Sequence, residues 1–220
     1  MGSAVIEDWA TCLAEQNQPW LAQVRKEVDG FFQVCSGVGL GAVALCVDDL
    51  TGDVLVVRKS VRPGYEFSNL YALPGGMIRW RTSTEALRDA IAGSLFSRCE
   101  RETGLLLSCE TPLIPIDLFP PPTTRYLARG VVRHTLVLPF RVVRVRRFVP
   151  HAGDASVTEA SWQPPAVVLP AMAPANRVIL AHVLWSRLSA TAWRELVPCV
   201  QEAVGVCAEW ARSVGVAPVS

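Results

Sequence analysis

Acidic and basic side chains alternate within one short stretch near the middle of the chain, at Arg98, Glu100, Arg101 and Glu102. Carboxylate oxygens are the ligands that Mg²⁺ prefers in proteins, and the guanidinium group of arginine pairs well with phosphate oxygens. If this stretch is helical, Arg98 and Glu102 lie four residues apart on one face, and Glu100 points away from both. The stretch therefore allows a metal site built on Glu102 or an Arg98–Glu102 ion pair, and the ion pair is the simpler interpretation.

The same stretch belongs to a longer pattern that begins at Leu73-Pro74-Gly75-Gly76 and ends at Glu100-Arg101-Glu102-Thr103-Gly104-Leu105. These segments resemble the two ends of a Nudix box, a loop–helix–loop motif whose glutamates hold divalent metal ions against a diphosphate. The middle departs from the motif, because Ser97 stands at the arginine position, Arg98 and Arg101 stand at glutamate positions, and about seven extra residues precede Ser97, roughly two helical turns. The resemblance implies an α/β Nudix-type sandwich, with a mixed sheet between helices and helical extensions at both termini.

The resemblance also implies roles for individual residues. Glu102 is the surviving family glutamate, so it is a candidate catalytic residue and metal ligand, and Asp89 is a second candidate metal ligand if a break near Gly93 folds the helix back. Glu100 and Glu159 are candidate substitute acids, and Mg²⁺ is a candidate cofactor that the altered box does not assure. Candidate contacts to a phosphate-containing substrate are basic or belong to the box loop: Arg58, Arg62, Gly75, Gly76, Arg98 and Arg101.

Hydrophobic periodicity predicts the elements around the box. Apolar runs predict strands at 43–47 and 54–57, within 131–149 and at 156–162. A helix is predicted to begin near Ser83 or Thr84, with Leu87, Ile91, Leu95 and Cys99 directed toward the core at a spacing of four. From Ile6 to about Cys35 the apolar residues lie near helical spacing, which predicts two helices divided by Pro19, and further helices are predicted at 177–188 and 192–214.

Length and composition agree with one compact domain and additions at its ends. Half of the 220 residues are hydrophobic, and the net charge of +1 argues against a strongly basic nucleic-acid-binding protein. We expect an N-terminal helical extension at 1–36, a Nudix-like domain at 37–190 and a C-terminal helical extension at 191–220. Acidic residues near the N-terminus argue against a signal peptide, and no apolar run is long enough to span a bilayer, which predicts a cytoplasmic protein without a membrane partner. The seven cysteines lack zinc-site spacing and are expected to be mostly reduced packing residues.

Three functions remain open from the sequence. The first is a divergent Mg²⁺-dependent hydrolase of a nucleoside diphosphate-linked or other phosphate-containing molecule. The second is a catalytically degenerate module that binds such a ligand, with Arg98 and Arg101 in contact with phosphates that metal ions would otherwise bridge. The third is an interaction protein whose terminal helices form a homodimer or bind a protein partner. Magnesium dependence separates the first two, and an unbroken helix from Glu85 to Thr103 would favour the binding module.

Overall fold

The computed structural model describes residues 24–216, apart from 28, 36, 64, 119–120, 129–130, 144 and 186–188. Most of the stretch expected to form two N-terminal helices, residues 1–23, lies outside the described residues. The part that is described forms two short antiparallel strands, β1 (Arg25–Lys26) and β2 (Phe32–Cys35). The helical prediction was wrong for this part, because Phe32 and Val34 follow the period of two by which a strand buries one face.

The larger sheet has seven strands and is mixed. Its main path runs β1-β2-β3-β9-β7, with β6 paired to β3 and β8 paired to β9. The pairing of β3 with β9 is parallel, and the other pairings in this sheet are antiparallel. The strands not yet given are β3 (Val38–Cys46), β6 (Gly75–Met77), β7 (Leu113–Pro115), β8 (Thr123–Ala128) and β9 (Val131–Val142).

A smaller sheet is formed by β10 (Val157–Gln163), β4 (Val54–Lys59) and β5 (Tyr71–Ala72), in the order β10-β4-β5. Its strands β4 and β10 include most of the runs predicted at 54–57 and 156–162. The strand pattern expected within 131–149 ends at Val142, and the described residues from 145 to 149 carry no strand.

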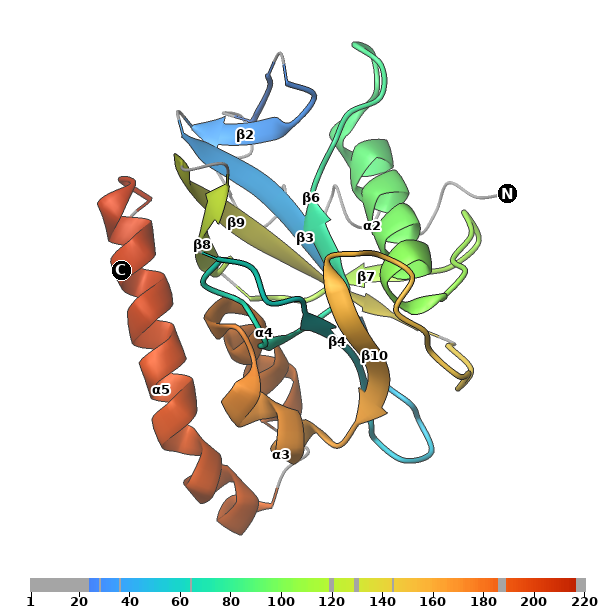
Figure 1. The fold of residues 1–220 in the computed structure, drawn as a ribbon, viewed down its shortest axis with the longest axis vertical. Helices are drawn as coiled ribbons and strands as arrows, with labels where there is room; N and C mark the ends of the chain where they lie inside the picture. The colour runs from blue at the N-terminus through green and yellow to red at the C-terminus, as the bar shows by residue number, and fades with distance from the viewer. Residues whose placement is uncertain are drawn as a thin grey trace.

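Helices lie on two sides of the larger sheet (Figure 1). One side carries α2 (Leu87–Thr103), and the other carries α4 (Pro174–Leu184) and α5 (Ala190–Ser213). A short helix α3 (Pro165–Val168) and a 3-10 turn (Leu169–Ala171) precede α4. The α/β sandwich with a mixed sheet, expected from the sequence, is therefore confirmed.

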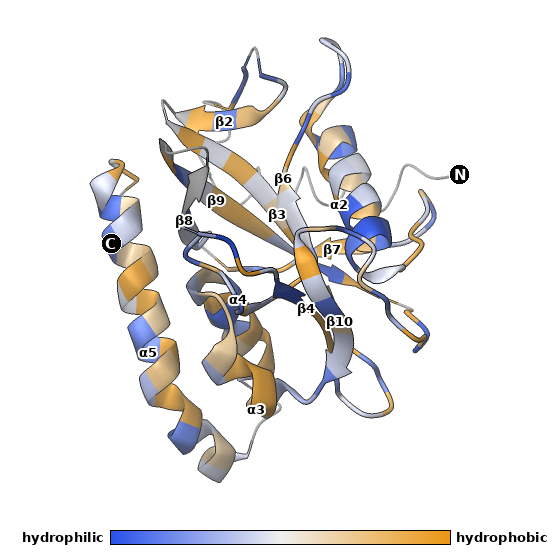
Figure 2. Ribbon diagram, in the orientation of Figure 1, coloured by the Kyte–Doolittle hydropathy of each residue, from blue (hydrophilic) through white to orange (hydrophobic). Residues whose placement is uncertain are grey.

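Alternation along β3 explains the two layers. Leu40, Ala42 and Ala44 belong to the buried cluster that contains α2 residues, whereas Val43 and Leu45 belong to the cluster under α4 and α5. Because successive side chains of a strand point to opposite faces, a strand covered on both sides must be apolar throughout. In Figure 2, β9 and α4 are orange over much of their length, with blue bands at their polar residues.

The helix of the box, α2, is continuous over its 17 residues. It begins at Leu87, a few residues later than predicted, and ends at Thr103. Gly104 caps it with a left-handed backbone (φ 77°), and its N–H donates to the Glu100 carbonyl. Ile91, Leu95 and Cys99 are buried, as their spacing predicted. The break considered near Gly93 is absent from the helix, so the box helix is a single rigid element.

The C-terminal helices pack on each other and on the sheet. Leu196 and Cys207 of α5 enter the same buried cluster as Ile179 and Leu184 of α4. The proposed domain limits at 36 and 190 stay predictions. Across the described part of the chain, no helix is both long and apolar enough to cross a membrane.

Candidate functional site

A pocket of about 650 Å³, called the main pocket below, opens where four segments meet. They are the box loop (residues 73–76), β3, α2 and the β4–β5 loop. The described residues that line the pocket include four basic side chains and one carboxylate. These charged lining residues are Lys59, Arg62, Arg79, Arg98 and Glu102. The excess of positive charge makes the main pocket suited to an anion.

Glu102 is engaged on both of its carboxylate oxygens. The Lys59 ammonium lies 2.9 Å from Oε1, and the Gly75 N–H donates to Oε2 over 3.1 Å. Arg98 Nη1 lies 3.7 Å from Oε1, so the expected Arg98–Glu102 pair is confirmed but is the looser of the two ion pairs. Only 1% of the Glu102 side chain and 11% of the Lys59 side chain are exposed. A carboxylate this deeply buried requires such partners, because an unpaired buried charge is costly.

Gly75 lets the box loop approach both β3 and Glu102. Its φ of 149° lies outside the range that residues with a side chain normally adopt, and a Cβ there would overlap the Ala42 carbonyl oxygen. The Asn176 side chain of α4 accepts the Leu73 N–H over 2.9 Å and anchors the start of the same loop. Sequence and backbone geometry thus fix the N–H that holds Glu102.

The neighbouring Gly76 makes room for Arg98. A Cβ at Gly76 would lie 3.2 Å from Arg98 Nε, so the guanidinium packs directly against the glycine. Arg98 also lies 3.7 Å from Asp154, which follows the β9 region in the sequence and precedes β10. The structure therefore brings four of the candidate residues, Gly75, Gly76, Arg98 and Glu102, close together.

The two basic candidates on and after β4 differ in position. Arg62 lines the main pocket and is oriented by the Ser60 hydroxyl and the Ala155 carbonyl. Arg58 is not among the lining residues; it donates to the Asn69 carbonyl and packs on the Tyr71 ring, with 5.3 Å from its Cζ to the ring centroid. Since alternate strand residues point to opposite faces, Lys59 enters the pocket and Arg58 does not.

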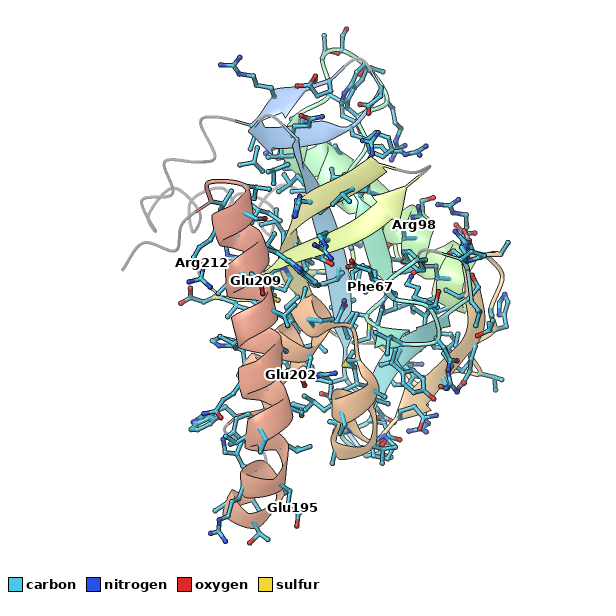
Figure 3. All side chains as sticks on the ribbon, turned by 60° about the vertical axis from the view of Figure 1, so that its left-hand side comes forward. Phe67, Arg98, Glu195, Glu202, Glu209 and Arg212 are labelled. Atoms are coloured by element: carbon cyan, nitrogen blue, oxygen red, sulfur yellow. The ribbon has the colours of Figure 1, made fainter. Side chains whose placement is uncertain are left out.

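The part of the main pocket away from these charges is apolar. Its lining includes Val43, Leu73, Val137 and Phe67, and Phe67 is held by an edge contact with Tyr65 at 5.4 Å between ring centroids. In Figure 3, Phe67 and Arg98 both lie to the right of α5, which carries Glu195, Glu202 and Glu209 along its length. An apolar region beside a few charged groups is typical of sites for organic ligands.

Three candidate acids do not reach the main pocket. Glu100 is exposed on another face of α2, and Glu159 accepts from the Ser161 hydroxyl on β10. Asp89 is 53% exposed in the first turn of α2 and pairs with Arg88. The continuous helix carries Asp89 about 20 Å from Glu102, so the break near Gly93 that would let these two residues share one metal ion is not present.

The residues around Glu102 do not fit a bound Mg²⁺ ion. Mg²⁺ requires oxygen ligands in near-octahedral geometry, usually with one or two carboxylates. The oxygens of Glu102 already face an ammonium and an N–H, and Asp154, the carboxylate that shares Arg98 with Glu102, pairs with Arg98 and Arg101 at 3.7 Å each. Within the described ranges, no group of three or more His, Cys, Asp and Glu side chains is arranged to hold a metal ion.

Sequence reasoning missed the Lys59–Glu102 pair and the role of Asp154. The pair joins residues 43 positions apart, and nothing local to either residue indicates it. Asp154 lies in the segment just before β10. Hydrogen bonding from Ser156, followed by the charges of Arg98 and Arg101, lowers the pKa of Asp154 below its ordinary 3.8.

Comparisons with solved structures return Nudix proteins. A MutT Nudix hydrolase from Burkholderia pseudomallei is 16% identical with a TM-score of 0.46, and the match covers 66% of this chain and 98% of that one. The Nudix domain of Shewanella oneidensis NrtR, solved with ADP-ribose, is 20% identical with a TM-score of 0.47, over 69% and 88% of the two chains.

An Ap4A hydrolase from C. elegans is 10% identical with a TM-score of 0.45, over 68% of this chain and 96% of that one. No model of a protein family matches the sequence, and no curated protein matches it. The three solved structures are similar to this chain in fold, and the similarity carries no substrate or reaction to it.

Proposed function

We propose that this chain binds a phosphate-containing organic anion in the main pocket, and that Lys59 supplies the positive charge there in place of a divalent metal. The observation that carries the proposal is the 2.9 Å contact between the Lys59 ammonium and Glu102 Oε1. A metal ion at this carboxylate would displace an ammonium that is itself nearly buried, and two cations would then compete for one anion.

The other cations of the main pocket support the same function. Arg62 and Arg98 are each held by neighbours at some of their N–H groups, and a guanidinium has five such donors. Oriented guanidinium groups bind phosphate oxygens through paired, charge-assisted hydrogen bonds. The apolar side of the pocket, with Phe67 and Val137, offers space for the organic part of the ligand.

Metal-dependent hydrolysis is the alternative, and the burial of Glu102 beside the box loop is the observation that favours it. It would require further carboxylates near Glu102. The unbroken α2 keeps Asp89 away, and Asp154 is paired with two arginines, so the geometry supports binding better than hydrolysis.

Calorimetry distinguishes the two functions. ADP-ribose is a suitable probe, because it carries two phosphates and it was seen bound to the NrtR Nudix domain. We expect the same dissociation constant within about twofold in EDTA and in Mg²⁺, because Lys59 does not depend on an added ion. Binding that appears only with Mg²⁺, or release of phosphorylated products during the titration, would contradict the proposal and favour the hydrolase.

The pocket is tested with matched variants. Lys59→Met together with Glu102→Gln removes both charges without leaving either one buried alone, and it should weaken the probe about tenfold or more. Arg58→Gln, one residue earlier on the other face of β4, removes a positive charge outside the main pocket and should leave affinity unchanged. A loss with Arg58→Gln as large as the loss with the double variant would mean that binding does not depend on this pocket.

A further inference from the structure

A second cavity, of about 520 Å³, lies against α2 beside the main pocket and is called the arginine cavity below. None of the described residues that line it is acidic. Its polar lining consists of four arginines and two serines: Arg79, Arg81, Arg98, Arg101, Ser94 and Ser97. Arg79 and Arg98 also line the main pocket, so the two cavities share a wall.

The guanidinium groups of the arginine cavity are oriented by their surroundings. Arg79 packs on the Phe31 ring at 4.5 Å from its centroid, and its backbone N–H donates to the Ser94 hydroxyl over 3.1 Å. Arg101 Nε donates to the Ser97 carbonyl over 3.3 Å. Groups that are already ordered lose less conformational entropy when a ligand binds.

One carboxylate, Asp154, lies 3.7 Å from both Arg98 and Arg101. It neutralises part of their charge and holds the two guanidinium groups near each other. Arg81 has its own partner, since its Nε lies 3.8 Å from Glu85 Oε1. Glu85, Asp154 and Glu102 pair with three of the four arginines, and Glu102 is also paired with Lys59, so the arginine cavity keeps a positive charge.

Gly93 gives the cavity its shape. This glycine lies within α2, where glycine disfavours the helix by about 1 kcal/mol relative to alanine. A Cβ at position 93 would overlap the Arg81 guanidinium. The missing side chain therefore lets Arg81 lie across the helix and face the same cavity as Arg101.

We propose that the arginine cavity is an anion site of its own, which takes a phosphate group distinct from the phosphate bound beside Lys59. A small organic molecule phosphorylated at two positions would then fill both cavities at once. The two-phosphate ligand rests on the function proposed above, whereas the anion site itself depends only on the arginines. Paired guanidinium donors and neighbouring hydroxyls are the groups that recognise phosphate oxygens.

An NMR titration with inorganic phosphate tests the two sites separately. Amide signals of Gly75 and Gly76 report the main pocket, and those of Ser94 and Ser97 report the arginine cavity. We expect both sets to shift, with separate dissociation constants. Arg81→Gln together with Arg101→Gln should weaken the response of Ser94 and Ser97 about tenfold and leave that of Gly75 and Gly76 within about twofold, because neither arginine lines the main pocket.

Two further variants complete the test. Gly93→Ala should weaken only the response at the arginine cavity, and the unfolding temperature should not fall, because alanine favours the helix and Arg81 can move. Arg88→Gln removes an arginine of the same helix that pairs with Asp89 and lines neither cavity, so it should change nothing.

The outcomes separate the two proposals. If the Lys59→Met/Glu102→Gln variant loses all phosphate shifts and the Arg81→Gln/Arg101→Gln variant keeps all of them, the second site is overturned and the main pocket stands. The reverse pattern would overturn the main pocket and support the second site. If phosphate shifts neither set in the unaltered chain, both proposals are contradicted.

Discussion

The Lys59 ammonium and the Glu102 carboxylate form a 2.9 Å ion pair that joins the end of β4 to the last turn of α2. The pair is almost fully buried, and the Gly75 N–H completes it. Its effect is that Glu102, the carboxylate among the described lining residues of the main pocket, is paired within the protein, so Lys59 and the arginines can face an anion without an unpaired negative charge beside them.

Glu102→Gln should increase the affinity of the main pocket for phosphate, by about threefold or more, because it removes the carboxylate that competes for Lys59 and Arg98. Calorimetry with inorganic phosphate measures the change. The matched control is Glu100→Gln, which neutralises an exposed carboxylate on the same helix and should have little effect. A weaker affinity in Glu102→Gln would indicate that the carboxylate contributes to ligand binding directly.

Removing Lys59 alone should destabilise the fold strongly. Lys59→Met leaves Glu102 buried without its closest partner, and breaking a buried pair in this way costs about 3–5 kcal/mol in the free energy of unfolding. The double variant with Glu102→Gln should recover most of that loss, as urea denaturation would measure. If the two single changes simply add in the double variant, the residues do not interact as the structure describes.

The two glycines of the box loop should respond differently to alanine. Gly75→Ala forces a Cβ into the β3 backbone at a φ of 149°, so we expect a loss of about 3 kcal/mol or more in the free energy of unfolding. In Gly76→Ala, the new Cβ meets only the flexible Arg98 side chain, at 3.2 Å. It should displace Arg98 with a much smaller loss in the free energy of unfolding. Thermal unfolding compares the two, and similar stabilities would contradict the backbone contact at Gly75.

Asp154 should contribute a stability that disappears in acid. Because its pKa is lowered in the folded chain, the folded state favours the ionised carboxylate, and the contribution is complete above the ordinary pKa of 3.8. It is lost as the pH falls from there through the lowered folded-state pKa. The free energies of unfolding of the unaltered chain and of Asp154→Asn, measured by urea denaturation, should therefore differ by a constant amount above about pH 5 and converge below about pH 4. A difference that stays constant into strong acid would contradict the shifted pKa.

The sequence predicts those parts of the fold that depend on local periodicity. The continuous apolar runs of β3 and β4, and the spacing of Ile91, Leu95 and Cys99 in α2, each reflect burial of one or both faces of a single element. The same reasoning failed from Val24 to Cys35, where two-residue and four-residue strands are too short to distinguish a period of two from a helical period.

The candidate site was predictable where its residues belong to the box, namely Gly75, Gly76, Arg98 and Glu102. Its remaining members come from other elements that only the tertiary fold brings near α2. Lys59 reaches Glu102 from β4, and Asp154 reaches Arg98 from the segment before β10. Residue type and spacing within one segment carry no information about such contacts, and so the Lys59–Glu102 pair was visible only in the structure.

The parallel pairing of β3 with β9 has a consequence for the order of folding. Val38 pairs with His134, so the central ladder joins positions about 96 residues apart, and contacts of such long range slow folding because a large loop must close first. The box loop pairs with β3 through Gly75 and Val43, next to this ladder. A chain emerging from the ribosome therefore has both glycines and the whole of α2 available before the strand that completes the central ladder has been synthesised. The anion site should consequently form late, and an immature chain should neither hold the ligand nor be stabilised by it.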